Sequence, residues 1–186
     1  MENIVNSGWV EVVAGCMFGG KSEELIKRIM RVQYANKKFQ IFHPQCDNRY
    51  SDQAVVSHDK AELPSTAVDE KNPLVIMDMV KTDTEVVGID EVQFFGDDIV
   101  EVANQLANQG KRVIVAGLDQ DFMGQPFGPA PALMATAEFV TKVHAVCVKC
   151  GNPASKSKRT VQSEEKVLIG AGDAYIPVCR RCYQAE

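Results

Sequence analysis

The sequence predicts an α/β fold, in which a mostly parallel sheet is flanked by helices and followed by a small C-terminal module. Apolar segments typical of buried strands alternate along the chain with amphipathic helical patterns, and this alternation is typical of parallel sheets. Four of the six cysteines form two close pairs near the end, Cys147/Cys150 and Cys179/Cys182. We therefore expect two units, with the sheet in residues 1–143 and the module held by the cysteines in residues 144–186.

Length and charge narrow the class of protein further. A chain of 186 residues suits one α/β core with an appended module. The net charge is −5 and the basic residues are mostly scattered, which argues against a general nucleic-acid binder. The longest apolar runs, such as Leu74–Met77, are far below the roughly 20 residues that cross a bilayer. With no basic segment followed by an apolar stretch at its start, the chain is expected to be cytoplasmic.

The first expected elements are a strand at Gly8–Ala14 and a helix that begins near Lys21. The helix carries Leu25, Ile29 and Val32 on one face. Between strand and helix stands GCMFGGKS, which fits the phosphate-binding pattern G-x-x-x-x-G-K-[ST]. Its glycines let backbone amides approach phosphate oxygens, and the start of the following helix adds a positive field. The sequence therefore predicts a P-loop, the phosphate-binding loop of nucleoside triphosphate-binding proteins.

Two side chains of this loop have expected roles, and one leaves an alternative open. Lys21 can reach the β and γ phosphates, and the Ser22 hydroxyl can ligate Mg²⁺. Cys16 is interpreted as a small packing residue, with a thiol activated by the helix start as the less favoured alternative.

The middle of the chain carries a second strand and a long polar stretch. Lys38–His43 is expected to be a strand, whereas residues 43–73 are polar and show no long periodic pattern. A loop of that length in a compact domain is usually functional or partly structured.

A third strand, Glu85–Ile89, ends in the acidic pair Asp90 and Glu91. In P-loop proteins a carboxylate at this place holds the Mg²⁺ shell, and Asp90 suits that role. Glu91 points another way and could take a proton from an attacking hydroxyl group or water. The pair alone leaves open whether the chain is an ATPase or a kinase.

The next elements are a helix, a strand and a constrained loop. Asp97 or Asp98 is expected to cap a helix that ends near Gly110. Lys111–Ala116 is the next expected strand. Residues 121–131 contain five glycines and prolines, which predicts a constrained loop.

The cysteine pairs predict a structural zinc site. Each C-x-x-C knuckle supplies two thiolates from one tight turn, and tetrahedral Zn²⁺ takes four. The zinc ligands are then Cys147, Cys150, Cys179 and Cys182. Because all four positions are filled by the protein, a catalytic zinc is not expected. The metal would hold together a module too small to fold on its own core.

Read together, the motifs extend over nearly the whole chain. They are GCMFGGKS, DNRYS at Asp47–Ser51, SHDK at Ser57–Lys60, IDEVQFF at Ile89–Phe95, GLDQDFMGQPFG at Gly117–Gly128, CVKCG at Cys147–Gly151, GAGDAY and CRRCY. In this order they resemble the thymidine kinase family of the zinc-containing, P-loop type (type II).

The resemblance implies transfer of the γ-phosphate of ATP to the 5′-hydroxyl of thymidine, giving dTMP, with Mg²⁺ and structural Zn²⁺. It implies Glu91 as general base. The residues implied to bind ATP and its Mg²⁺ are Gly15, Cys16, Met17, Phe18, Gly19, Gly20, Lys21, Ser22, Asp47, Arg49, Asp90 and Gln93. Those implied to bind thymidine are Phe122, Lys166, Val167, Leu168, Ile169, Gly170 and Tyr175. Family members are typically homotetramers inhibited by dTTP, with no membrane or nucleic-acid partner.

Two positions depart from the family pattern. Lys60 stands where glycine is common, and Ser157 stands where threonine is common. Neither change removes a catalytic group, and both bear on the range of nucleosides accepted.

Four aromatic residues are expected near the base-binding loops, with core packing as the alternative for each. They are Phe94, Phe95, Phe122 and Phe127.

Two other functions fit parts of the pattern. A P-loop ATPase with a zinc ribbon that binds nucleic acid or protein would use Arg180, Arg181 and the basic run Lys156–Arg159, although the acidic net charge opposes it. A nucleotide-binding protein without turnover is the third interpretation.

Overall fold

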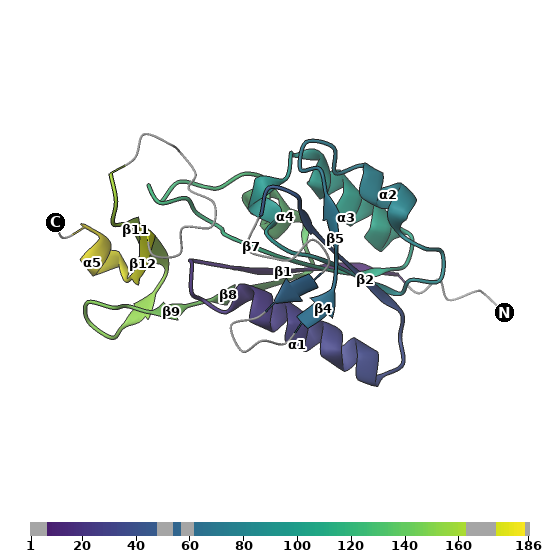
Figure 1. Cartoon of the computed structure of the whole chain (residues 1–186), viewed down its shortest axis with the longest axis horizontal. Helices are drawn as coiled ribbons and strands as arrows, with labels where there is room; N and C mark the ends of the chain where they lie inside the picture. The colour runs from purple at the N-terminus through teal and green to yellow at the C-terminus, as the bar shows by residue number, and fades with distance from the viewer. Residues whose placement is uncertain (1–6, 48–53, 57–61, 163–173, 185–186) are drawn as a thin grey trace.

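A six-stranded parallel sheet forms the centre of the molecule (Figure 1). The computed structural model describes residues 7–47, 54–56, 62–162 and 174–184. Every pairing within the sheet is parallel, and the strand order is β5-β2-β6-β7-β1-β8. The strands are β1 (Trp9–Gly15), β2 (Phe39–Pro44), β5 (Thr66–Val68), β6 (Val86–Ile89), β7 (Arg112–Gly117) and β8 (Phe139–Val143).

Helices cover both faces of this sheet, with α1 on one side and α2, α3 and α4 on the other (Figure 1). Successive residues of β1 serve opposite faces: Val13 packs in the cluster that holds α1, whereas Val12 packs in the cluster that holds α3. The helices are α1 (Lys21–Tyr34), α2 (Val75–Met79), α3 (Asp98–Asn108) and α4 (Ala130–Thr136), and a 3₁₀ turn η1 (Val92–Phe94) follows β6.

The elements that follow β8 form a small lobe, drawn in green to yellow in Figure 1. Its strands pair antiparallel as β9 (Ala145–Val146) with β10 (Pro153–Ala154), and β11 (Lys156–Arg159) with β12 (Tyr175–Val178). The lobe ends in α5 (Arg180–Gln184). None of the described helices is long and apolar enough to cross a membrane.

The strands β1, β2, β6 and β7 and the helices α1 and α3 confirm the elements expected from sequence, to within about two residues at their ends. The expectation of one irregular loop at residues 43–73 is wrong in part, because the stretch is partly structured. That stretch contains β3 (Ala54–Val56), β4 (Glu62–Pro64) and β5, and β5 extends the main sheet beside β2. Strands of three residues are too short to show a periodic pattern.

The expected aspartate cap of α3 is also wrong. Asp97 occupies the N-cap position, but its side chain makes no capping hydrogen bond. Its backbone is already helical, with φ −60° and ψ −23°, whereas a capping side chain works from an extended residue.

Candidate functional site

The predicted site segments meet at one edge of the sheet. Because all six strands are parallel, their carboxyl ends share that edge, where ligands bind in open α/β sheets. The P-loop follows β1, Asp90 and Glu91 follow β6, and Leu118 follows β7, the strand that lies between them.

The P-loop has the compact form expected of a phosphate cradle. The backbone is left-handed at Phe18, with φ 62°, and at Gly20, with φ 77°. A Cβ at Gly20 would lie 2.8 Å from the Glu23 carboxylate, so glycine suits both the conformation and the space. Lys21 begins α1, is largely buried and donates from Nζ to the Cys16 carbonyl at 2.9 Å. Loop amides and the positive end of α1 therefore lie together, as phosphate binding requires.

Cys16 packs as a structural residue. It is 2% exposed, and its Sγ donates to the Ala154 carbonyl at 3.2 Å. Burial raises the pKa of its thiol, and the nearby charge of Lys21 offsets only part of that rise. The neutral thiol is favoured, so the structure supports the packing interpretation over the activated one.

The acidic pair after β6 is buried and held by neighbouring groups. Asp90 is 1% exposed and accepts a hydrogen bond from the Glu91 amide at 2.9 Å. Glu91 is 5% exposed, and its backbone is left-handed with φ 51°, which is uncommon outside glycine. Backbone held in such a sparsely populated conformation is often found at active sites, in agreement with the expected catalytic role of Glu91.

Gln93, which was expected to contact the nucleotide, bridges two other parts of the protein. Its Nε2 donates to Glu91, and its Oε1 accepts from the Leu118 amide at 2.8 Å. Both ends of the side-chain amide are therefore engaged by the protein, and Gln93 is 3% exposed.

Asp47, three residues beyond the end of β2, is 3% exposed and reaches the same edge. Its amide donates to the Pro44 carbonyl at 3.2 Å, closing a turn after the strand. The expected ATP-binding residue Arg49 lies outside the described residues, as do the expected thymidine-binding residues at 166–170.

Phe122 is held against the C-terminal lobe. The Arg159 guanidinium lies 3.7 Å from the centre of its ring, so one face of that ring is already covered. Arg159 also donates to the Tyr175 hydroxyl at 2.8 Å, and the Tyr183 hydroxyl donates to the Phe122 carbonyl at 2.7 Å. From the sequence, the basic run that contains Arg159 supported only the alternative in which the zinc module binds nucleic acid or protein.

The other aromatic residues divide between site and core. Phe94 meets Phe127 edge to face, with ring centres 6.0 Å apart. Phe95 is 4% exposed and belongs to the core cluster beneath α3, so its expected place near the base is wrong. In an F-F pair the sequence does not tell which ring turns inward.

The four predicted zinc ligands lie together in the C-terminal lobe. The four Sγ atoms all lie within 4.8 Å of one another, and they belong to Cys147, Cys150, Cys179 and Cys182. The Cys150 and Cys179 sulfurs are 3.6 Å apart, too far for a disulfide but close to the roughly 3.8 Å edge of a tetrahedral Zn–thiolate site. Gly151, with φ 73°, closes the first knuckle by donating to the Cys147 carbonyl at 2.8 Å. The donor set fits zinc.

The zinc lobe also touches the P-loop. Ser157 of β11 is 5% exposed, and its hydroxyl accepts a hydrogen bond from the Met17 amide at 3.0 Å. Together with the bond from Cys16 to Ala154, this places β10 and β11 directly behind the phosphate-binding loop.

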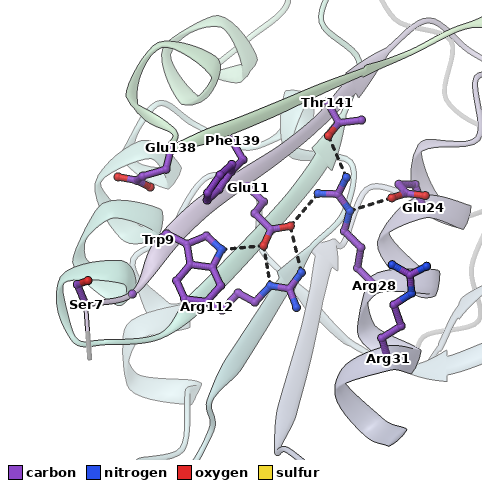
Figure 2. Close-up of a pocket in the computed structure, with 11 residues that line it drawn as sticks. Ser7, Trp9, Glu11, Glu24, Arg28, Arg31, Arg112, Glu138, Phe139 and Thr141 are labelled. Carbon is purple, nitrogen blue, oxygen red and sulfur yellow. Dashed lines mark hydrogen bonds and ion pairs between the residues drawn. The ribbon is translucent and has the colours of Figure 1, made fainter. Parts of the chain in front are cut away.

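A separate open pocket lies at the opposite, amino end of β1, beside α1 and β8 (Figure 2). Glu11 stands at its centre and accepts hydrogen bonds from Trp9, Arg28 and Arg112. Burial by itself would raise the pKa of Glu11, but the hydrogen bonds from Arg112 and Trp9 and the charges of Arg112 and Arg28 lower it overall. Glu24 also pairs with Arg28, at 2.9 Å, so two carboxylates balance two guanidinium groups and the cluster is structural.

Comparison with known proteins agrees with the site. A thymidine kinase family model matches residues 8–183. The thymidine kinase of Rhodothermus sp. (strain ITI 518) is 52% identical over 95% of this chain and 82% of its own length. That of Bacteroides fragilis (strain YCH46) is 51% identical over 95% of this chain and 87% of its own.

Among solved structures, the genome packaging NTPase B204 of Sulfolobus turreted icosahedral virus 2 is a more distant likeness. Its TM-score is 0.45 and its identity 16%, over 74% of this chain and 75% of that one. The family model and the relatives do not favour a P-loop ATPase with a zinc ribbon. The chain belongs to the thymidine kinase family.

Proposed function

We propose that the protein transfers the γ-phosphate of ATP to the 5′-hydroxyl of thymidine, giving dTMP and ADP. The observation that carries the proposal is the meeting of the P-loop, the Asp90–Glu91 pair and the Phe122 loop at one edge of the sheet, in a chain of the thymidine kinase family. This edge offers a phosphate cradle, a buried carboxylate beside it and an aromatic wall for a flat base.

The P-loop amides and Lys21 bind the phosphate tail and hold the γ-phosphorus in line with the acceptor. Ser22 and Asp90 would hold Mg²⁺ through their oxygen atoms, and the bound ion would neutralise the charge that develops on the phosphate. The Glu91 carboxylate accepts the proton of the 5′-hydroxyl as its oxygen bonds to the γ-phosphorus. The bond from that phosphorus to the ADP oxygen breaks, and ADP leaves with those electrons.

Phe122 and Tyr175 form the described part of the thymidine site, joined through Arg159. We further propose that Asp47 and Arg49 approach the phosphates and that residues 166–170 close over the base. Zinc bound by the four cysteines would hold the two knuckles together, and so would support β11 and β12 on either side of that loop. We also propose that the chain divides into units at 1–143 and 144–186 and that it forms a cytoplasmic homotetramer. dTTP would inhibit it by binding in the acceptor site.

Incubation of the protein with MgATP and a panel of nucleosides, followed by identification of the product, tests the reaction. We expect dTMP in equimolar amount with ADP. ADP formation stimulated by DNA or RNA with no phosphorylated nucleoside would overturn the proposal. A Glu91→Gln variant is expected to keep ATP binding and to lose about 10²- to 10⁴-fold in kcat.

A further inference from the structure

A buried side-chain bridge joins the proposed base to the neighbouring strand. Gln93, in the 3₁₀ turn after β6, donates from Nε2 to the Glu91 carboxylate. Its Oε1 accepts from the backbone amide of Leu118, just beyond β7, at 2.8 Å. Glu91 and Gln93 are 5% and 3% exposed, so water competes little for either bond.

The partners decide which way the Gln93 amide faces. A backbone N–H can only donate, so the end that meets Leu118 must be the oxygen. The NH₂ end therefore faces Glu91. The bridge holds one oxygen of the Glu91 carboxylate through a side chain whose other end is fixed to the backbone of Leu118.

The space around Gln93 leaves it little freedom to turn away. A Cβ on Gly117 would lie 2.5 Å from Gln93 Oε1, so the bridge passes over a position where any side chain would collide. A Cβ on Gly128 would lie 2.5 Å from the Gln93 carbonyl oxygen, and Gly128 has φ 49°. Glycines thus let two backbone segments approach Gln93 closely.

We propose that Gln93 is a positioning residue, which holds the Glu91 carboxylate directed toward the acceptor hydroxyl. This inference rests on the proposed role of Glu91 as general base. It assigns Gln93 to the orientation of the base instead of to nucleotide binding.

The test uses two substitutions of similar length in the full chain. Gln93→Glu keeps an acceptor for the Leu118 amide but replaces the donor to Glu91 by an oxygen that repels the carboxylate. We expect kcat to fall about 10-fold or more while KM for MgATP changes less than about threefold. Gln93→Met removes both hydrogen bonds, and we expect kcat to fall about 10- to 100-fold while KM for MgATP changes less than about threefold.

Gln105→Glu is the matched control. Gln105 also donates to a glutamate, Glu101, at 2.6 Å, but on the exposed face of α3 away from the site. We expect its kcat and its KM for MgATP to equal those of the unmodified protein. Thermal unfolding of each variant separates loss of fold from loss of positioning.

Two results would overturn the inference. One is a kcat for Gln93→Glu equal to that of the unmodified protein, and the other is a loss confined to KM for MgATP, which would make Gln93 a nucleotide ligand. Glu91→Gln, measured alongside, separates the role of Glu91 as the base from the role of Gln93 in positioning it. Full activity of Glu91→Gln would refute the base itself, whereas an inactive Glu91→Gln with unaltered Gln93 variants would refute the positioning role alone.

Discussion

The Glu11 cluster offers a quantitative test of what holds β1, α1 and β7 together. Glu11 is 7% exposed, and four hydrogen bonds reach its carboxylate (Figure 2). Oε1 accepts from Trp9 at 2.7 Å and from Arg112 Nε at 2.6 Å. Oε2 accepts from Arg28 at 2.8 Å and from the Arg112 terminal nitrogen at 3.2 Å.

Glu11→Gln keeps the shape and removes half of these bonds. The amide oxygen can retain the two partners of Oε1, but the NH₂ group then faces two guanidinium donors. Two charge-assisted bonds are lost, at about 1.5 kcal/mol each, because the side chains of Arg28 and Arg112 are partly exposed and regain some hydration. The expected loss is about 3 kcal/mol in the free energy of unfolding, or about 6–12 °C in Tm for a chain of this size.

Thermal unfolding followed by circular dichroism measures the loss, with Glu85→Gln as the matched control. Glu85 pairs with Lys37 at 3.2 Å, but both side chains are about half exposed, so its substitution should cost at most about 1 kcal/mol. Activity at a temperature where both variants are folded should be unchanged, because the cluster lies at the end of β1 opposite the P-loop. Equal Tm losses for Glu11→Gln and Glu85→Gln would refute the reasoning.

The same variant predicts a pH dependence. Folding lowers the pKa of Glu11 below its ordinary value of 4.5, so its contribution to stability is complete above that pH and is lost as the pH falls through the folded value. The stability difference between the unmodified protein and Glu11→Gln should be constant near neutral pH and should narrow below pH 4.5. A difference that grows on acidification would contradict the assignment.

Three further predictions concern the proposed site at the carboxyl ends of the strands. Cys150→Ser should lose zinc by elemental analysis and, because the lobe supports the P-loop, should raise KM for both thymidine and ATP; full activity with bound zinc would contradict this. Ser157→Ala removes the acceptor of the Met17 amide and should raise KM for ATP about fivefold, the equivalent of about 1 kcal/mol, whereas an unchanged KM would show that the contact is incidental. Gly117→Ala places a Cβ 2.5 Å from Gln93 Oε1, and in steady-state assays it should lower kcat while changing KM less. Gly124→Ala provides a comparison with a glycine outside the bridge.

Features carried by contiguous residues could be predicted from the sequence. The P-loop pattern needs only its own glycines, its lysine and the strand and helix on either side, and the structure places it between β1 and α1. The C-x-x-C knuckles are local as well, and the sulfur cluster follows once the two are brought together. The strand that precedes Asp90 could likewise be predicted from its run of apolar residues.

Contacts between distant segments could not be predicted in this way. The three-residue strands β3, β4 and β5 have no pattern of their own, and β5 is a strand because β2 supplies its hydrogen bonds. Phe94 and Phe95 are chemically alike, and only the packing of α3 turns Phe95 into the core.

The sequence by itself predicted the chemistry that we propose, which is a loop for phosphates, a carboxylate for a proton and four thiolates for a metal, and it indicated the family to which the chain belongs. Only the tertiary structure decided how these groups are held, as in the bridge from Leu118 through Gln93 to Glu91 and the support of Met17 by Ser157. The physical reason is that a motif records which atoms can react, whereas orientation depends on partners 25 and 140 positions away along the chain. Such partners share no local pattern and meet only when the sheet and the zinc lobe have formed.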